Sequence, residues 1–241
     1  MQASPTDQRR LLELAEVDLA ITRAKHRRST LPELAQLGDL AGQRKAVTQT
    51  LVAAETALSD LVVEQDRLEA DLTPARARLE RNQKKVDDGE IADPKALRAM
   101  VEEIEHLKGR ITKLEDEELE LMQQIEDATG VRDDIAGKRR VIDEQGRAML
   151  GRRDAAFGEI DAEVTELSAR REGVARVLAA DLVGLYEKAA AKAGTGAAKF
   201  ADGRCQGCRV EADAADLRRY SSAGPDDVVR CEECGRILVR A

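Results

Sequence analysis

Four cysteines near the C-terminal end of the 241-residue sequence form two Cys-x-x-Cys pairs, Cys205 with Cys208 and Cys231 with Cys234. The chain has no other cysteine. A Cys-x-x-Cys turn lets two thiolates converge on one ion, and zinc takes four sulfurs at about 2.3 Å in a tetrahedron. The spacing therefore predicts one structural Zn2+ bound by all four cysteines. Two alternatives stay open: a redox dithiol, which lacks the usual strand-to-helix context here, and an iron centre held by the same thiolates.

A zinc ion with four protein ligands keeps no open coordination position, so it cannot activate water. The two histidines, His26 and His106, lie far from the cysteines in sequence and are interpreted as helix-surface residues. We recognise no phosphate-binding loop, nucleophile elbow or paired carboxylates in a credible pocket. We therefore expect a protein that is not an enzyme and has no small-molecule substrate.

The residues around the cysteines predict a small β-type domain. Val228 and Val229 precede the second pair and Ile237 to Val239 follow it, a pattern typical of two short strands in a hairpin. Gly235 directly after Cys234 suits a tight turn, whereas Arg209 holds the equivalent place after Cys208 and predicts a less standard turn. A unit of this size buries too little apolar surface to fold alone, so the metal should supply the missing free energy.

The composition indicates that the rest of the chain is helical. Charged residues make up 36% of the sequence, aromatic residues only 2%, and Trp is absent, which favours long helices or coiled coil over a thick core. The net charge is −8, so the whole molecule offers no field that attracts polyanions. We recognise neither a signal-peptide core nor an apolar run of about 18 residues, so we expect a cytoplasmic protein with no membrane contact.

The first helix should begin with Ser4 as N-cap and Pro5 at the first helical position, and end near Arg28. A break near 29–32 follows, where Thr30 and Glu33 are spaced as in a capping box around Pro32. A second helix then begins.

Mostly apolar residues, spaced alternately four and three apart and here called the seam, continue along two segments separated by a turn near 87–94. The turn contains Gly89, Asp93 as N-cap and Pro94, whereas Pro74 keeps the phase and should only kink its helix. The first segment runs through Val47, Leu51, Ala54, Leu58, Leu61, Gln65, Leu68, Leu72, Ala75, Leu79, Asn82 and Val86. The second runs through Leu97, Val101, Ile104, Lys108, Ile111, Leu114, Leu121, Ile125, Ala128, Ile135, Ile142 and Met149.

Two long seams joined by a short turn predict an antiparallel coiled-coil hairpin. We assign residues 1–192 to this hairpin and 193–241 to the zinc ribbon, giving a mainly α fold with a small C-terminal β-type domain. The stretch from Ile160 to Leu178 keeps helical spacing and could pack against the first helix.

The pattern LRAMVEEIEHLKGRITKLEDEELELM after the turn, with CQGC and CEECGRIL at the end, resembles a bacterial family of coiled-coil hairpin proteins with a C-terminal four-cysteine zinc ribbon. The resemblance covers nearly the whole chain. It implies that Cys205, Cys208, Cys231 and Cys234 are the zinc ligands and that the hairpin is an interaction arm. Members of this family are implicated as flagellar or secretion assembly chaperones that bind export components, an alternative sigma factor or messenger RNA.

Two functions are considered for the chain. The first is a non-enzymatic adaptor that binds a partner protein through the hairpin and the ribbon; the alternative is an RNA- or DNA-binding protein acting through the ribbon. Arginine suits phosphate contact, and Tyr220 beside Arg218 and Arg219 could stack on an exposed base, which supports the alternative. Acidic residues at 226, 227, 232 and 233 would repel a nucleic-acid backbone, which favours a protein partner. The candidate contact residues are Arg209, Arg218, Arg219, Tyr220 and Arg236.

Overall fold

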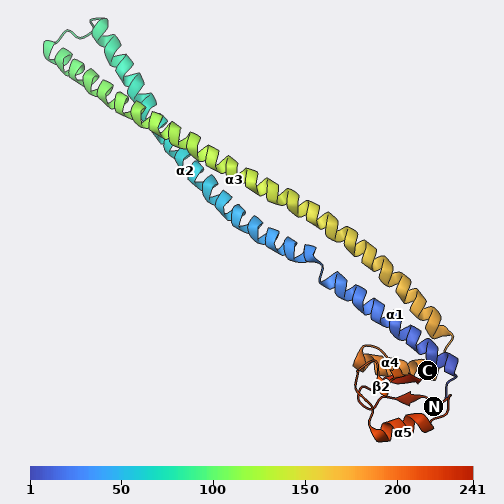
Figure 1. Ribbon diagram of the computed structural model, residues 1–241. Coiled ribbons are helices and arrows are strands. Elements are labelled where there is room, and N and C mark those ends of the chain that lie inside the picture. Colours follow the sequence, from blue (N-terminus) through green and yellow to red (C-terminus); the bar gives the residue numbers. More distant parts are fainter. Residues whose placement is uncertain (241) are drawn as a thin grey trace. The chain divides into compact units, whose positions relative to one another are not determined.

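The computed structural model describes residues 1–240, so residue 241, the last of the expected ribbon, lies outside the described residues. The chain forms two compact units, Gln36–Met149 and Met1–Ala35 with Leu150–Ala241. The structure confirms a mainly α fold with a small strand region at the C-terminal end (Figure 1). Its elements are α1 (Pro5–Ser29), α2 (Pro32–Asp87), α3 (Pro94–Arg176), α4 (Ala180–Ala193), β1 (Ala197–Ala201), β2 (Arg204–Cys205), α5 (Ala214–Ser222), β3 (Val229–Arg230) and β4 (Ile237–Arg240).

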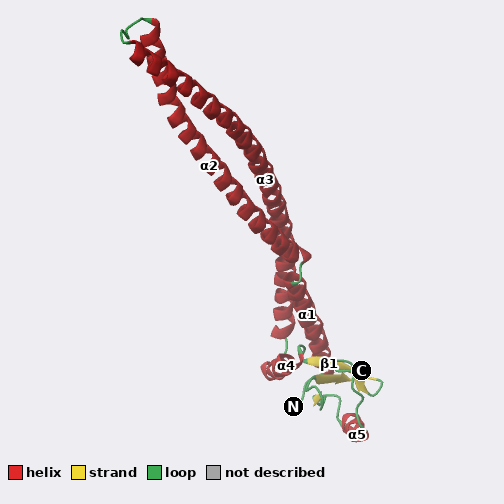
Figure 2. Ribbon diagram, turned by 90° about the vertical axis from the view of Figure 1, so that its left-hand side faces the viewer, coloured by secondary structure: helices red, strands yellow, loops and turns green. Residues whose placement is uncertain are grey.

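Within the unit 36–149, α2 and α3 run side by side in opposite directions and are joined by a short loop (Figure 2). Helix α2 continues through Pro74, as expected. Asp93 caps α3, since its carboxylate accepts from the backbone N–H groups of Lys95 and Ala96 at 3.3 and 3.2 Å. Gly89 has a φ of 67°, a conformation that costs glycine nothing. The expected helical hairpin and its turn are confirmed.

The seam forms the interior of the hairpin. Leu72, Ala75 and Ile111 are buried together, with Leu79 and Leu114 packed against them. Four ion pairs also cross between the helices: Arg44 with Asp143 at 2.6 Å, Arg76 with Glu115 at 2.8 Å, Arg110 with Asp71 at 3.6 Å, and Arg78 with Glu103. Exposed ion pairs contribute little stability, so the buried apolar residues hold the hairpin together.

The expected start of the α3 seam is wrong in part. Leu97, Val101 and Lys108 are exposed, whereas Met100 and Leu107 are half-buried on either side of the buried Ile104. Counting back from Ile111 in alternating steps of four and three reaches Leu107, Ile104 and Met100. The first helical turns after the loop were therefore assigned to the wrong face.

In the other unit, α1 packs against the end of α3 and against α4. Ser4 caps α1 by accepting from the N–H of Asp7 at 3.1 Å. Arg28 of α1 donates to Asp161 of α3 at 2.9 Å, which confirms that this part of α3 lies on the first helix. Thr30 does not form the expected capping box; its hydroxyl donates to the carbonyl of His26 and so ends α1.

The core of this unit has a few large side chains from helices and strands. Leu11 and Leu14 of α1, Leu182 and Tyr186 of α4, and Ile237 of β4 are fully or almost fully buried in one cluster. The helices and the C-terminal sheet therefore share one hydrophobic core.

The sheet has the order β2-β1-β4-β3, with β1 parallel to β4 and the β3–β4 pair antiparallel, which confirms the hairpin around the second cysteine pair. Its side chains alternate between two clusters. Ala197 and Ile237 belong to the helical core, whereas Ala198 and Leu238 pack with Cys205, Cys231 and other residues of the ribbon. Because successive strand residues point to opposite faces, the sheet separates the helical core from the cysteine site.

The N-terminus adds a further contact that the sequence did not indicate. The N–H of Ala3 donates to the carbonyl of Asp226 at 2.8 Å, and that of Val228 donates to the carbonyl of Met1 at 3.1 Å. The N and C labels accordingly lie close together (Figure 1). The ribbon is thus attached to α1 by backbone pairing as well as by the shared core.

One helical stretch between Pro5 and Asp87 is long and apolar enough to cross a membrane. An 18-residue window in it has a mean hydropathy of 1.2, and 6% of this window is buried. This differs from the expectation that no stretch would approach those values. Length and composition alone do not establish a span.

Candidate metal centre

The four cysteine sulfurs converge on one point. All four lie within 4.8 Å of one another, with 3.9 Å between Cys205 and Cys234 and 3.8 Å between Cys208 and Cys231. Four sulfurs at about 2.3 Å from a tetrahedral zinc lie about 3.8 Å apart, which these distances match. All four are free thiols, and disulfide sulfurs would be only about 2.05 Å apart. The site fits one structural zinc ion, as the sequence predicts.

Both Cys-x-x-Cys turns have the same backbone form. The N–H of Arg209 donates to the carbonyl of Cys205 at 2.7 Å, and the N–H of Gly235 donates to the carbonyl of Cys231 at 2.9 Å. Their φ angles are 64° and 73°. The expectation of a less standard first turn is therefore wrong in geometry: Arg209 adopts the left-handed conformation that Gly235 adopts without steric cost.

The local surroundings affect the thiols unequally. Burial raises the pKa of Cys205, and it raises the pKa of Cys231 to about 12. Burial also acts to raise the pKa of Cys234, but hydrogen bonds from the backbone and side chain of Arg236 and from the thiols of Cys231 and Cys208 together outweigh it and lower the pKa to about 7. Zinc binds thiolates, so it displaces the protons that burial holds on the thiols of Cys205 and Cys231.

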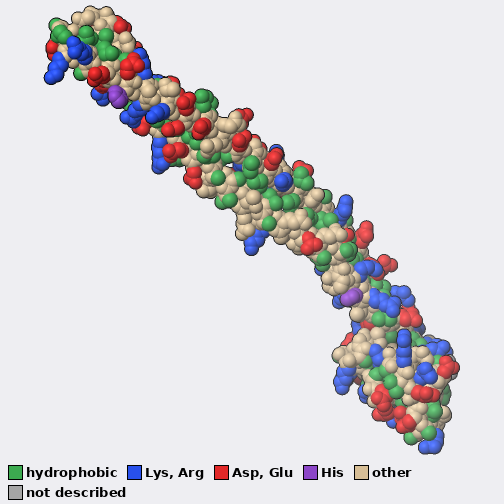
Figure 3. Space-filling view, turned by 60° about the vertical axis from the view of Figure 1, so that its left-hand side comes forward, with side chains coloured by type: hydrophobic (Ala, Val, Ile, Leu, Met, Phe, Trp, Pro, Cys, Tyr) green, Lys and Arg blue, Asp and Glu red, His purple; other side chains and the backbone are tan. Residues whose placement is uncertain are grey.

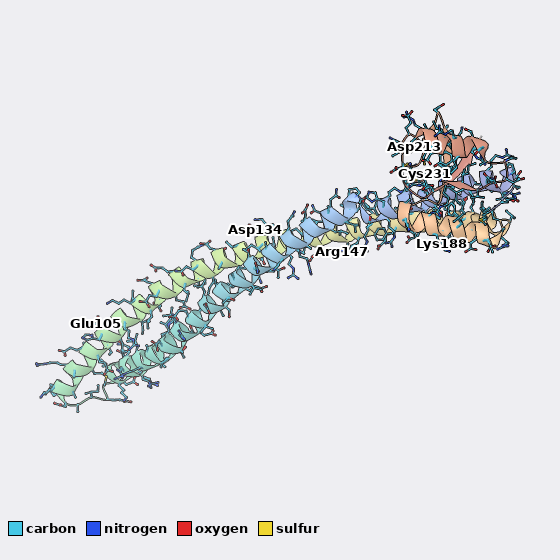
Figure 4. All side chains as sticks on the ribbon, turned by 90° about the horizontal axis from the view of Figure 1, so that it is seen from below. Glu105, Asp134, Arg147, Lys188, Asp213 and Cys231 are labelled. Atoms are coloured by element: carbon cyan, nitrogen blue, oxygen red, sulfur yellow. The ribbon has the colours of Figure 1, made fainter. Side chains whose placement is uncertain are left out.

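Aromatic and apolar residues enclose the site on the side away from the helical core. Tyr220 of α5 is 4% exposed, meets Phe200 edge to face at 5.2 Å, and donates from its hydroxyl to the carbonyl of Arg230 at 3.1 Å. Helix α5 is itself held by Asp213, whose carboxylate accepts from two backbone N–H groups. Asp213 and Cys231 lie in the same small domain (Figure 4).

The candidate contact residues of the ribbon differ in whether their side chains are free to contact a partner. Arg209 and Arg218 are exposed. Arg219 contacts Glu232 at 2.5 Å and Asp216 at 3.2 Å, and Arg236 donates to the side chain of Thr195 at 2.9 Å and to the carbonyl of Ala193.

Tyr220 is the candidate whose expected role the geometry opposes. Its ring is buried against Phe200, so it offers no face on which a base could stack. The hypothesis placed Tyr220 beside Arg218 and Arg219 as a side chain that could stack on an exposed base. Tyr220 instead lies on the face of α5 that packs against the sheet.

Sequence reasoning missed a hollow of about 70 Å³ beside the cysteines, here called the ribbon hollow. Aromatic and apolar side chains form part of its wall and acidic side chains surround it. The spacing of Asp213 and Asp216 before a short amphipathic segment is a helix-start signal that could have located α5 and this wall. The lining residues are Phe200, Cys205, Val210, Glu211, Ala212, Asp213, Asp216, Tyr220, Cys231, Glu232, Glu233 and Leu238.

The two histidines stand apart from the site. His26 lies on α1 and His106 on α3, and both are exposed. Neither belongs to the group of four sulfurs.

Comparisons with known proteins agree with this architecture. Uncharacterized proteins of two Mycobacterium tuberculosis strains are 32% identical over 251 residues, covering 100% of this chain and 98% of theirs. A solved Mycobacterium smegmatis structure matches with a TM-score of 0.91 at 33% identity, with 100% of both chains covered. The structure of CT398 from Chlamydia trachomatis shares the fold, with a TM-score of 0.69, 14% identity and 98% of both chains covered.

Family models match both parts of the chain. Residues 14–194 match the CT398-like coiled coil hairpin domain, and residues 204–238 match the C4-type zinc ribbon domain. The second match contains all four cysteines of the site. The chain therefore belongs to the family of CT398-like coiled-coil hairpin proteins that carry a C4-type zinc ribbon.

Proposed function

We propose that the protein is a non-enzymatic cytoplasmic adaptor, which binds partner proteins through its helical hairpin and its zinc ribbon. The observation that carries this proposal is the closed set of four sulfurs within 4.8 Å of one another. An ion held by four protein thiolates has no position for a substrate or a reactive water, so the metal acts as a structural support for the surface around it. Neither matching family model describes an enzyme.

The ribbon surface supports a protein partner over nucleic acid. Five carboxylates surround the ribbon hollow: Glu211, Asp213, Asp216, Glu232 and Glu233. They would repel a phosphate backbone at this face. RNA recognition would use Tyr220 to stack on a base and Arg219 to contact a phosphate. Tyr220 is buried and Arg219 is paired with two carboxylates, so both side chains already make contacts within the ribbon.

A test compares what the ribbon contacts inside cells. A photo-reactive residue placed at Arg218, which is exposed on α5, should give protein adducts after irradiation, and the same residue at exposed Lys188 of α4 serves as the control. RNA should not be enriched with the Arg218 probe over the Lys188 probe. RNA enrichment at Arg218 would contradict the adaptor proposal and support the alternative.

The same choice can be tested with purified protein. Binding to random-sequence RNA at physiological salt should be weak, and Arg209→Glu with Arg218→Glu should leave it unchanged. Tight binding that falls steeply with added salt and is abolished by these two changes would establish the nucleic-acid function instead.

A further inference from the structure

The middle of the helical hairpin carries large apolar side chains that the hairpin itself does not cover. On α3, Leu119 is 65% exposed and Met122 is 50% exposed. With Gln65 of α2 and Gln123, Ile125 and Glu126 of α3 they line an open hollow of about 440 Å³, here called the hairpin hollow. Positions 119, 122, 123 and 126 follow the spacing of one helical face, so these side chains point to the same side of α3.

On α2 the seam is less tightly closed at this point than farther toward the turn. Leu61 and Leu68, on either side of Gln65, are only half-buried, whereas Leu72 and Ile111 are buried. Val62, which lies one turn before Gln65 on the same face of α2, is 40% exposed. The hairpin hollow therefore offers uncovered apolar surface on both helices, and hydrophobic side chains are seen on the surface along the hairpin (Figure 3).

Charge around the hairpin hollow is almost entirely negative. Residues 60–71 and 115–127 together contain twelve acidic residues and one basic residue, Arg67. This part of α3 lies between the labelled Glu105 and Asp134 in Figure 4. The acidic residues are Asp60, Glu64, Asp66, Glu69, Asp71, Glu115, Asp116, Glu117, Glu118, Glu120, Glu126 and Asp127.

Only three of these carboxylates form ion pairs within residues 1–240. Glu64 pairs with Arg67, Asp71 with Arg110 and Glu115 with Arg76. The other nine have no Lys, Arg or His nitrogen within 4.0 Å in this described part of the chain. Self-repulsion in such a segment is relieved by a partner that brings positive charge.

We propose that the hairpin hollow binds a basic amphipathic helix of a partner protein. Apolar side chains of that helix enter beside Leu119 and Met122, and its Lys and Arg side chains pair with the surrounding carboxylates. An apolar groove that receives residues spaced i, i+3, i+4 and i+7 is a common mode of helix recognition, and methionine adapts to varied partners. The inference rests on the proposed adaptor function and defines the chemistry of the partner.

The negative charge around the hairpin hollow favours a basic helix over the other possible occupants. Nucleic acid and anionic lipid surfaces are repelled by the same carboxylates. A second copy placed here by twofold symmetry would bring the two acidic segments against each other, which is unfavourable. A helix that combines an apolar face with lysine and arginine satisfies both features.

The test uses the full-length zinc-loaded protein and a synthetic helical peptide of leucine and lysine, with leucines at i, i+3, i+4 and i+7. Fluorescence anisotropy at physiological salt should show binding that Leu119→Gln with Met122→Gln weakens at least tenfold. The matched control, Val52→Gln with Val141→Gln, replaces two apolar residues of similar exposure outside the hairpin hollow and should change affinity less than twofold. Circular dichroism should show unchanged helicity in both variants, since all four side chains are exposed.

Two further measurements separate the apolar contribution from the charge contribution. A peptide with serine in place of leucine should bind at least tenfold more weakly. Asp116→Asn with Glu126→Gln, on the same face as Leu119, should weaken the leucine–lysine peptide and reduce its salt dependence. This second variant also tests the hairpin hollow if the first loses helicity.

The proposal is overturned if the leucine–lysine peptide does not bind, or if the two double glutamine variants weaken its binding equally. It is also overturned if the serine peptide binds as tightly as the leucine–lysine peptide. It is also overturned if sedimentation shows self-association that Leu119→Gln with Met122→Gln abolishes, because a second copy then occupies the surface. Each of these results leaves the cross-linking test at Arg218 unaffected. Failure of the hairpin hollow is thus distinguishable from failure of the adaptor function.

Discussion

The hydroxyl of Tyr186 donates a 2.7 Å hydrogen bond to Oδ2 of Asp18, joining α4 to α1 inside the core beside the ribbon. Nε of Arg171, on α3, donates to Oδ1 of the same carboxylate at 2.7 Å. Three helices therefore meet at Asp18, whose two oxygens each have a partner. Because a buried charge is stable only when it is paired and hydrogen-bonded, this arrangement fixes how the helices pack around the completely buried ring of Tyr186.

Tyr186→Phe should lower the free energy of unfolding by about 2 kcal/mol, since a hydrogen bond to a charged acceptor contributes about that much and the ring would stay in place. Urea unfolding followed by circular dichroism measures the change. A loss below about 0.5 kcal/mol would show that the contact to Asp18 adds little beyond the packing of the ring.

Tyr186 should also make the stability of the protein depend on pH in the alkaline range. Burial, and then the hydrogen bond to Asp18, raises the pKa of Tyr186 above its ordinary value of 10.0. Above about pH 10 the unfolded chain loses this proton while the folded chain keeps it. Stability should therefore fall with rising pH by up to about 1.4 kcal/mol per pH unit for this group. Tyr186→Phe should show a shallower decline above pH 10; an identical slope would assign the decline to other residues.

Gly196 lies directly against Tyr186. A Cβ at this position would lie 2.2 Å from the carbonyl oxygen of Tyr186 and 2.5 Å from its ring. Gly196→Ala should therefore displace β1 or Tyr186 and lower stability by more than about 2 kcal/mol. Gly184→Ala in α4 is the control, since nothing lies within 4 Å of its added Cβ and alanine favours a helix. In thermal unfolding, the control should melt at or above the temperature of the unchanged protein. Equal effects of Gly196→Ala and Gly184→Ala on the melting temperature would contradict the close contact.

The parts of this architecture that the sequence predicts are those encoded by local patterns. Seam spacing, the cap at Asp93 and the Cys-x-x-Cys pairs each depend on residues a few positions apart, and the structure confirms the helices, the turn and the cysteine cluster that follow from them. Asp18 and Tyr186 are 168 positions apart, and their contact depends on how α1 and α4 pack. No local pattern contains that information.

The errors have physical causes of the same kind. Val101 and Lys108 fit the alternating count of four and three but not the face that meets α2, which holds Met100, Ile104 and Leu107. The burial of Tyr220 comes from the packing of α5 on the sheet, which the neighbouring Arg218 and Arg219 do not indicate. The parallel pairing of β1 with β4 depends on strands separated by both cysteine pairs, and no hairpin signal marks it.

Arg209 is the one residue of the cysteine turns that should be improved by substitution. Its φ of 64° costs a residue with a Cβ about 1 kcal/mol, whereas Gly235 at 73° has no such cost. Arg209→Gly should raise the stability of the zinc-loaded ribbon by roughly that amount and slow zinc transfer to a chelator. Gly235→Ala should have the opposite effect. If Arg209→Gly accelerates zinc loss, the arginine side chain stabilises the turn by more than the strain costs.

Removing a zinc ligand should affect the two faces of the sheet differently. Cys208→Ser leaves three thiolates, so bound zinc should fall from about one per chain, as metal analysis can measure. Residues on the cysteine side, Leu238 among them, lose their support, whereas Ile237 faces the helical core with Leu11. Hydrogen exchange should therefore show lost protection in α5 and both turns, with protection retained in α1 and α4 and most of the helical signal intact.

Chelation followed by zinc addition is the control for this experiment, since it should remove and then restore the same protection in the unchanged protein. Full zinc occupancy in Cys208→Ser would contradict the four-sulfur site. Equal loss of protection in α1 and α4 would show that the helical core depends on the metal as much as α5 does, and that the sheet does not separate the two clusters energetically.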